Sequence, residues 1–377
     1  MGTRPEVIKL ASVIAALRDA GDTQCLVALT GQHRELLDQA LKAFGLGARF
    51  DLGLMRRDQT IKAFMGRALP GLGRLLRRTR PDLVIVQGDT ATALCGALAA
   101  FQECIPVAHV EAGLRTFDLA SPFPEEGNRR LIDALAELLF APTPQASRNL
   151  AGSPRARVFV TGNTAVDAVR WAAAHPRPVR DPALAGVLAG LRAQEALILV
   201  TLHRRESFDG ALRGACAALR ALLEERPEAH IVFPVHLNPK VQSIVRRALR
   251  HPRAHLLAPL DYPDLVTVLR RCRFVMTDSG GLQEEAPSLG KPVLVLRRVT
   301  ERPEAVRAAV ARVVGFEPAS IIGQASRLLD GGGAYRRMAR RVEVFGDGQA
   351  GRRIAAGIRW FFGLSRRPAD FRPKSRG

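Results

Sequence analysis

The sequence is poor in aromatic residues and has no long apolar run. It contains two Trp and two Tyr among 377 residues. Its apolar runs, such as those at 82–87 and 196–202, are far shorter than the roughly 20 residues that a membrane-spanning helix needs. These runs exclude insertion into a membrane and fit buried strands, and with 47% hydrophobic residues they indicate a globular protein.

Cysteines and cofactor motifs are also scarce. The cysteines form no Cys-x-x-Cys pair and have no histidine at metal spacing, so we expect reduced, packed thiols and no metal site. No strand-like run leads into Gly-x-Gly-x-x-Gly, and neither nicotinamide nor another cofactor is expected. No basic and apolar leader opens the chain, which predicts a cytoplasmic protein. The five cysteines are Cys25, Cys95, Cys104, Cys216 and Cys272.

Positive charge is in excess. The 56 Lys and Arg residues outnumber the 36 Asp and Glu residues, giving a net charge of +20 at pH 7. Such a charge suits a polyanionic partner. The few aromatic residues and the absence of a recognisable nucleic-acid module argue against nucleic acid. Part of the excess lies in the tail at 358–377, where a solvated end explains it.

Short β-rich runs alternate with longer alanine-rich or amphipathic stretches along the chain. This alternation predicts an α/β protein with parallel sheets and helices on both faces. A proline-broken stretch at 172–195 contains no strand-like run. We therefore predict an N-terminal Rossmann-like domain at 1–175, a C-terminal Rossmann-like domain at 190–350, and a C-terminal helix and basic tail at 351–377.

Polar residues directly follow several of the strand-like runs. In open parallel sheets, ligands bind beyond the carboxyl ends of the strands. The sequence places Gly-Asp-Thr at 88–90, Glu-Ala-Gly-Leu-Arg at 111–115, His-Arg-Arg-Glu at 203–206 and Ser-Gly-Gly at 279–281. Carboxylates and cations therefore follow strands in both halves.

The turn Ser279-Gly280-Gly281 lies between a strand and a helix expected to begin near Leu282. Free backbone N–H groups and the positive end of the helix suit a phosphate there, although glycine also serves any tight turn. Glu285 lies about one turn into that helix, where its carboxylate would accept both hydroxyls of a ribose. Turn and acid together predict a site for a nucleoside diphosphate.

Four basic residues are candidates to bind that diphosphate. For Arg302, a surface salt bridge with Glu301 or Glu304 is the alternative. For Lys9, a solvated helix face is the alternative. The four candidates are Arg4, Lys9, His203 and Arg302.

Asp89, Glu111 and Glu125 form a group of acids. The first two end buried strands, and burying a carboxylate that serves neither a ligand nor a partner is costly. Clustered acids raise one another's pKa values, which predicts a neutral proton donor beside an ionised acceptor. Glu126 competes with Glu125 for this role, and the arginines at 129–130 could pair with either glutamate on a helix surface.

Taken in order, these motifs resemble those of non-hydrolysing bacterial UDP-N-acetylglucosamine 2-epimerases, over nearly the whole chain. The family implies a GT-B fold, in which two Rossmann-like domains with parallel sheets face an interdomain cleft that binds the substrate, and it suggests a homodimer. The motifs include GTRPEVIKL at 2–10, VQGDTATAL at 86–94, PVAHVEAGLRT at 106–116, SPFPEEGNR at 121–129, LVTLHRRESF at 199–208 and TDSGGLQEEAPSLGKPVLVLR at 277–297.

The resemblance also implies residue roles. Asp89, Glu111 and Glu125 would transfer protons at the sugar, and His203 would act on the phosphate side. Where Leu260 and Leu265 stand, some relatives have glutamine and phenylalanine. The residues that would hold UDP are Arg4, Lys9, Leu260, Leu265, Ser279, Gly280, Gly281, Glu285 and Arg302.

Some relatives bind a second UDP-N-acetylglucosamine as an activator. Gln32, Arg204 and His236 match the motifs that they use, which predicts an allosteric site. Asp58 stands where some activator-dependent relatives have arginine, so it places a negative charge near an expected phosphate.

The implied reaction is reversible epimerisation at C2 of UDP-N-acetylglucosamine to UDP-N-acetylmannosamine, by elimination and re-addition of UDP, in support of surface polysaccharide synthesis. One rival is a hydrolysing epimerase, although such relatives have His-Pro-Val where this chain has the motif at 203–206. Another rival is a GT-B glycosyltransferase, which the three acids disfavour. The non-enzymatic alternative is a basic anion-binding module.

The opening loop Gly2-Thr3-Arg4-Pro5 raises a separate expectation. In the family this loop follows an apolar first strand, whereas here Met1 stands directly before it. We expect that the first strand is missing, because the start was misassigned or the protein was truncated. Neighbouring strand edges would then lack partners and Arg4 would be poorly anchored.

Overall fold

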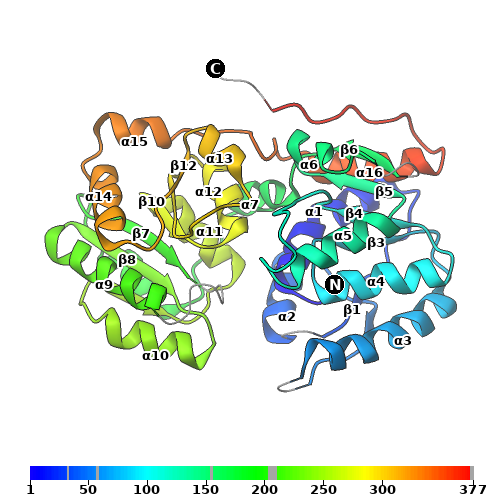
Figure 1. The fold of residues 1–377 in the computed structure, drawn as a ribbon, viewed down its shortest axis with the longest axis horizontal. Coiled ribbons are helices and arrows are strands. Elements are labelled where there is room, and N and C mark those ends of the chain that lie inside the picture. Colours follow the sequence, from blue (N-terminus) through cyan, green and yellow to red (C-terminus); the bar gives the residue numbers. More distant parts are fainter. Residues whose placement is uncertain (32–33, 57–58, 153–155, 203–209, 374–377) are drawn as a thin grey trace. The chain divides into compact units, whose positions relative to one another are not determined.

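Two compact units make up the chain (Figure 1). The computed structural model describes residues 1–31, 34–56, 59–152, 156–202 and 210–373. The first unit consists of Met1–Ala168 and Phe345–Gly377, and the second of Val169–Val344.

A four-stranded parallel sheet, in the order β3-β4-β5-β6, forms the centre of the first unit. Its strands are β3 (Val84–Gln87), β4 (Val107–Val110), β5 (Leu138–Ala141) and β6 (Arg157–Val160). A separate parallel pair consists of β1 (Ala28–Leu29) and β2 (Phe50–Asp51). The helices are α1 (Arg4–Ala20), α2 (Arg34–Ala43), α3 (Ile61–Thr79), α4 (Ala91–Gln102), α5 (Glu125–Leu135), α6 (Pro144–Arg148), α7 (Thr164–Ala174), which crosses the boundary of the units, and α16 (Ala350–Phe361).

A six-stranded parallel sheet, in the order β12-β11-β10-β7-β8-β9, forms the centre of the second unit. Its strands are β7 (Ala196–Thr201), β8 (Ala229–Pro234), β9 (Ala254–Leu257), β10 (Phe274–Thr277), β11 (Val293–Val295) and β12 (Ala311–Val313). The helices are α8 (Pro182–Gly190), α9 (Gly210–Glu225), α10 (Pro239–Ala248), α11 (Tyr262–Arg271), α12 (Gly280–Ser288), α13 (Pro303–Arg307), α14 (Pro318–Leu329) and α15 (Gly332–Met338).

Alternating apolar residues of this second sheet pack against the helices. Ile198 and Val200 of β7 and Phe233 of β8 are fully buried in one cluster with Leu219 of α9 and Ile321 of α14. Each large apolar side chain removed from water stabilises the fold by about 1.5–3 kcal/mol. The α/β class and the two Rossmann-like units predicted from the sequence are confirmed.

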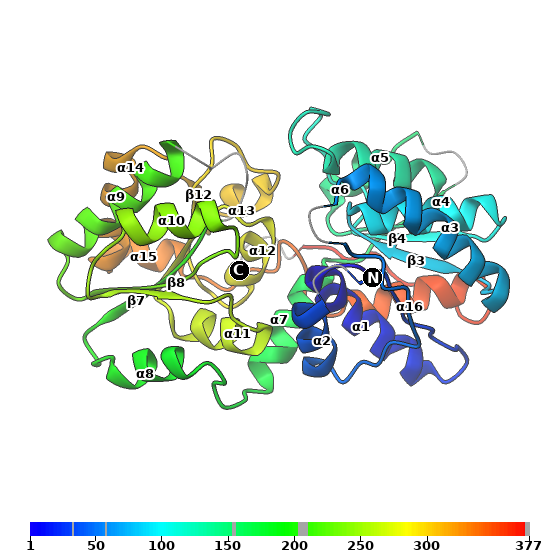
Figure 2. The same ribbon diagram turned by 90° about the horizontal axis from the view of Figure 1, so that it is seen from below.

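The closing segment belongs to the first unit. There α16 packs against α1 (Figure 2). Gly351 permits this close approach, because a Cβ atom at that position would lie 2.6 Å from the backbone of Ser12. Further along, the Phe371 N–H donates to the Val160 carbonyl at 2.6 Å and lengthens the contact with β6.

The observed units differ from the expected division at 1–175, 190–350 and 351–377. The boundary lies at Ala168 and Val169, inside α7, and the closing helix belongs to the first unit. The proline-broken stretch at 172–195 marked the link between helices α7 and α8. This stretch did not mark the change of unit, because the boundary between the units lies earlier, inside α7.

An apolar cavity of about 550 Å³ lies beside Met1 in the first unit. The Met1 ammonium donates to the Ala28 carbonyl at 2.8 Å, and the Met1 carbonyl accepts from the Thr30 N–H at 3.0 Å, as in a parallel strand pair. Burial lowers the pKa of this ammonium, although the Glu6 carboxylate opposes the shift. The lining includes residues of α1, β1 and β3: Leu10, Val13, Ile14, Ala28, Val84 and Val86. The expected strand ahead of Met1 stays a prediction.

Within the described part of the chain, no helix combines the length and the apolar character needed to span a bilayer.

Candidate functional site

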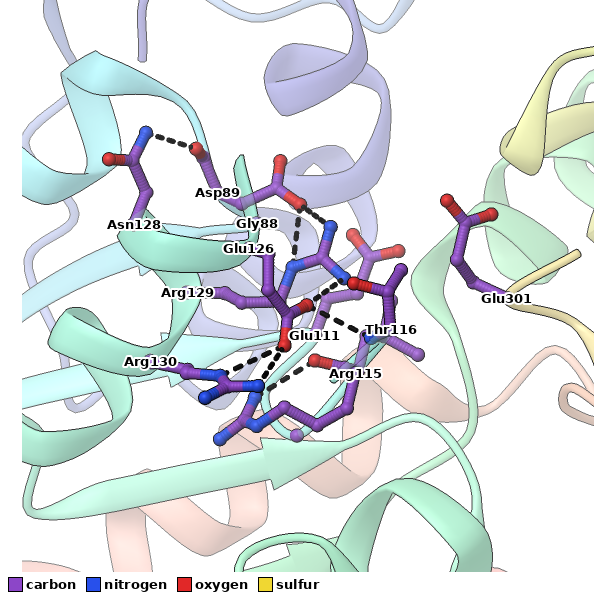
Figure 3. A network of polar contacts seen from close by, with 12 residues as sticks. Gly88, Asp89, Glu111, Arg115, Thr116, Glu126, Asn128, Arg129, Arg130 and Glu301 are labelled. Carbon is purple, nitrogen blue, oxygen red and sulfur yellow. Dashed lines mark hydrogen bonds and ion pairs between the residues drawn. The ribbon is translucent and has the colours of Figure 1, made fainter. Parts of the chain in front are cut away.

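Asp89 and Glu111 lie at the carboxyl edge of the first unit's sheet (Figure 3). They follow β3 and β4, which pair in parallel with Gln87 opposite Val110, so the two acids come together as the strand-end rule predicts. Glu125 is the first residue of α5, the helix whose later residues contact Asp89. The structure therefore brings Asp89 and Glu111 together at one edge of one sheet, and it places Glu125 at the start of the helix that holds Asp89.

Asp89 is held by two residues of α5. Arg129 donates its Nε and Nη2 to one Asp89 carboxylate oxygen, at 3.1 and 2.6 Å, and Asn128 donates to the Asp89 main-chain carbonyl at 2.8 Å. The Asp89 side chain keeps 30% of its surface exposed, whereas that of Arg129 keeps 7%. The pairing of Arg129 with Glu126 considered from the sequence is confirmed, but Arg129 is buried and does not lie on the helix surface.

Glu111 is enclosed by donors. Its carboxylate accepts from Lys9 Nζ at 2.6 and 2.7 Å, from Asn163 Nδ2 at 3.3 Å and from the Gln87 side chain. Its backbone has a φ of 72°, a conformation that non-glycine residues seldom adopt and that is enriched at functional sites. Lys9 lies in this buried contact, so the solvated helix face considered for it is wrong.

Glu125 and Glu126 have different surroundings. Glu126 is fully buried and accepts from the backbone N–H groups of Thr116 and Phe117, at 3.0 and 3.3 Å, and from Arg129 and Arg130. These contacts fasten the loop after β4 to α5. Among the residues that the structure describes, the partly exposed Glu125 carboxylate has no hydrogen-bond partner, which leaves it open to a ligand.

The loop at 2–6 is built around Glu6. The Glu6 carboxylate is buried and accepts from the N–H groups of Gly2 and Thr3, at 3.0 and 2.7 Å. Gly2 is required because a Cβ atom there would lie 2.1 Å from the Thr92 hydroxyl oxygen. Arg4 is the first residue of α1, and Lys9 lies one and a half turns further along that helix.

The second unit contains the predicted turn for a phosphate. Ser279 precedes α12, which begins at Gly280 rather than near Leu282, so both glycines lie in the first helical turn. The Arg302 guanidinium would be 3.3 Å from a Cβ atom on Gly280. Helix N–H groups and a guanidinium therefore meet at one place, which suits an anion.

Arg302 is positioned by an acid of the same helix. Its Nε donates to Glu284 at 2.5 Å, and both side chains are buried. A surface salt bridge, the alternative considered for Arg302, is wrong because this arginine is buried, and Glu301 pairs with Arg297. The guanidinium therefore lies over the start of α12 in a fixed orientation.

Glu285 lies on α12 with its side chain mostly buried, and Tyr262 at the start of α11 donates its hydroxyl to Glu285 at 3.4 Å. Leu260 is buried just before this helix, and Leu265 is half-buried on it. The residues expected to hold the base and the ribose thus lie at the ends of neighbouring elements of the second unit.

Most of the remaining predicted residues lie outside the part of the chain that the structure describes. These are His203, Arg204, Gln32 and Asp58. His236 is exposed after β8, and its Nδ1 accepts from the Asn238 N–H at 3.1 Å. The allosteric set therefore stays a prediction.

Several residues that hold the predicted side chains in the two units were not predicted. Asn163 follows β6, so the strand-end rule could have found it. The contacts of Arg129 with Asp89, of Glu284 with Arg302 and of Tyr262 with Glu285 form only through tertiary packing, and no spacing in the sequence gives them. No group of three or more His, Cys, Asp or Glu side chains suited to a metal ion occurs within the described residues.

Comparison with known proteins gives one consistent result. A family model described as UDP-N-acetylglucosamine 2-epimerase matches residues 15–359. The UDP-N-acetylglucosamine 2-epimerase of Escherichia coli (strain K12) is 44% identical over 365 residues, covering 95% of this chain and 96% of that protein.

Solved structures agree with the sequence comparison. S. aureus MnaA, solved with UDP, has a TM-score of 0.90 at 39% identity and covers 98% of each chain. UDP-GlcNAc 2-epimerase from Neisseria meningitidis, solved with UDP-GlcNAc, has a TM-score of 0.90 at 38% identity, covering 95% of this chain and 97% of that one.

Proposed function

Because the chain belongs to the UDP-N-acetylglucosamine 2-epimerase family, we propose that it interconverts UDP-N-acetylglucosamine and UDP-N-acetylmannosamine without releasing free sugar. The observation that carries the proposal is the pair of acids Asp89 and Glu111 at the carboxyl edge of β3 and β4 (Figure 3). Glu125 at the start of α5 adds a third carboxylate that is open to a ligand. The cytoplasm, a homodimeric state and a role in surface polysaccharide synthesis belong to the same proposal.

The reaction begins with an elimination. A carboxylate removes the proton from C2 of the sugar, a double bond forms between C1 and C2, and the bond from C1 to the diphosphate oxygen breaks with its electrons leaving on UDP. The diphosphate then adds back to C1 while an acid protonates C2 from the other face. Two proton-transfer groups are needed, and Asp89, Glu111 and Glu125 supply three carboxylates.

The leaving UDP needs positive groups that are already in place. In the second unit, the start of α12 and the Arg302 guanidinium, held by Glu284, supply them. We assign the diphosphate to Ser279, Gly280, Gly281 and Arg302, with Arg4, Lys9 and His203 as further cations. Glu285 would bind the ribose, and Leu260 and Leu265 the base. An activator at Gln32, Arg204 and His236 remains part of the proposal.

Lys9 has a second role in this scheme. In the described structure its ammonium contacts the Glu111 carboxylate, so it orients the acid before any diphosphate arrives. A cation shared by an acid and a leaving group would link proton transfer at C2 to charge development at the diphosphate.

A proton NMR time course in D₂O tests the function. With UDP-N-acetylglucosamine we expect the second epimer to appear and the C2 proton signal of both sugars to disappear, because each turnover exchanges that proton with solvent. Asp89→Asn should reduce this exchange by at least about 100-fold.

Other outcomes separate the rivals. Free N-acetylmannosamine accumulating in solution would indicate a hydrolysing enzyme, and sugar transfer to an added acceptor would indicate a glycosyltransferase. Epimer formation without deuterium at C2 would contradict the elimination. Anion binding that weakens with salt and persists in Asp89→Asn, without turnover, would support the binding module.

A further inference from the structure

His109 is a fully buried histidine in the centre of the first unit's sheet. It lies in β4, opposite Val86 of β3 and Leu139 of β5. Its Nε2 lies 2.8 Å from the Gly88 carbonyl oxygen, and its Nδ1 lies 2.6 Å from an Asp133 carboxylate oxygen. Both ring nitrogens therefore face oxygen atoms at hydrogen-bond distance.

These partners decide the protonation of the ring. The Gly88 carbonyl can only accept, so Nε2 carries a proton. The other Asp133 oxygen accepts from Arg115 Nη2 at 2.6 Å and from the Gly113 N–H at 3.3 Å. Burial raises the pKa of Asp133, but the neighbouring His109 and Arg115 outweigh it, so the pKa is lowered overall and the carboxylate is ionised. Nδ1 lies within hydrogen-bond distance of this carboxylate and can donate to it while Nε2 donates to Gly88, so the geometry allows both ring nitrogens to act as donors.

The cluster connects the two turns that carry the proton-transfer acids. On one side His109 holds the carbonyl of Gly88, the residue before Asp89. The φ of 70° at Gly88 makes this turn a sharp one. On the other side Asp133 holds Gly113 and Arg115, which follow Glu111. One buried pair thus determines the course of the chain after β3 and after β4.

The neighbouring contacts point to the same edge. Asn128 holds the Asp89 carbonyl and Arg129 holds the Asp89 carboxylate. With Asp133 these residues come from one helix, α5, which also begins with Glu125. The helix that contributes Glu125 therefore fixes the place of Asp89 in three ways: directly through Asn128 and Arg129, and through Asp133, which acts by way of His109.

We propose that His109, held doubly protonated by Asp133, is a positioning residue that fixes the Gly88 carbonyl and so sets the Asp89 carboxylate for proton transfer at the sugar. The proposal rests on the proposed epimerase function. His109 touches no reacting atom. Its fixed charge and two directed hydrogen bonds keep the acids in place during the proton transfers at C2.

The first test concerns the ring itself. A long-range ¹H–¹⁵N correlation spectrum of the wild-type protein labelled on histidine should show protons on both His109 nitrogens. Asp133→Asn keeps the shape of the pair, because the amide N–H₂ can donate to Nδ1 while the amide oxygen accepts from Gly113. In that variant the ring should become neutral, with one proton on Nε2. A neutral His109 ring in the wild-type protein would overturn the proposal.

The second test concerns turnover. In Asp133→Asn and in His109→Gln, kcat should fall by about 10-fold to 100-fold, because the acids lose their exact placement. KM for UDP-N-acetylglucosamine should stay within about threefold, since the substrate contacts themselves remain. UDP affinity measured by calorimetry should also be unchanged. A kcat within about threefold of the wild type in both variants, or an equal loss of UDP affinity and kcat, would overturn the proposal.

Arg115→Gln is the matched control. It removes the other cation from Asp133 and leaves the contact between Asp133 and His109, so the ring should stay an imidazolium and kcat should fall less than in Asp133→Asn. An equal loss in Arg115→Gln would assign the effect to the loop after Glu111 and overturn the role of the ring. Absence of epimerisation in the wild-type protein would refute the proposed function, while the spectrum would still decide the state of His109.

Discussion

At the scale of single residues, neighbours in the sequence have separate tasks. Glu126 is fully buried and receives four donors, so its carboxylate is committed to holding the loop after β4. Glu125 makes no such contact with the described residues, although it precedes Glu126 directly. The sequence left these two glutamates as equal candidates, because burial depends on which side of α5 faces the sheet.

We expect Glu125→Gln and Glu126→Gln to affect different properties. The first should reduce kcat by about 10²-fold to 10⁴-fold with an unchanged melting temperature, because a proton-transfer group is lost. The second should lower the free energy of unfolding by about 3 kcal/mol, because the buried Arg129 and the partly exposed Arg130 both lose the Glu126 charge, and should reduce kcat less. Steady-state kinetics and thermal melts of both variants check this. The larger loss of turnover in Glu126→Gln would show that the roles are reversed.

At the scale of elements, the end of α7 nearest the sheet is joined to the start of α16. Asp167 accepts from the N–H groups of Ala350 and Gly351, at 3.2 and 2.8 Å, and so caps the closing helix from a residue far away in the sequence. Burial raises the pKa of Asp167 from 3.8 to about 6, although these two N–H groups lower it in part.

This pKa predicts how stability depends on pH. A carboxyl group whose pKa is raised on folding favours the folded state at low pH, and that advantage is lost as the pH rises from about 4 to about 6. The loss should amount to about 3 kcal/mol, from a shift of about two units at 1.36 kcal/mol each. The free energy of unfolding, measured with urea between pH 4 and pH 7, should fall by this amount in the wild type and in Asp19→Asn, an exposed control on α1. It should not fall by this amount in Asp167→Asn. Parallel curves for wild type and Asp167→Asn would contradict the prediction.

The elements differed in how well the sequence predicted them. The apolar runs at 82–87 and 196–202 each contain a strand, because a buried parallel strand is a continuous apolar segment. The strands β2 and β12 have two and three residues, which are too few to show a period in the sequence. The strand-end rule located Asp89 and Glu111. It could not give Arg129, Glu284 or Tyr262, which lie on helices and meet their partners through packing.

At the scale of the whole molecule, the two units differ in continuity. Val169–Val344 is one uninterrupted segment with its own core, whereas the first unit needs both ends of the chain. Gly357 passes close to the ring of Phe140, where a Cβ atom would lie at 2.8 Å, and Phe159 stacks edge-on against Trp360. A first unit without its closing segment would therefore expose the apolar surface of β5 and β6.

We expect residues 169–344 expressed alone to unfold in one cooperative thermal transition, because they retain a complete core. Residues 1–168 alone should lack such a transition. Joining Ala168 to Phe345 with a short glycine and serine linker should restore it, since the Asn163 N–H already donates to the Phe345 carbonyl at 2.6 Å. Calorimetry of the three proteins checks this, and a cooperative transition in residues 1–168 alone would contradict it.

The enclosed amine of Met1 limits how the protein can be handled. Any purification tag fused in front of that residue would exchange the buried ammonium for an amide and enter the 550 Å³ cavity between α1, β1 and β3. The polarity of the tag residues next to Met1 would then affect stability. Apolar residues would fill the cavity and add main-chain pairing. Charged residues would be buried among apolar side chains and would destabilise the packing of the surrounding helices.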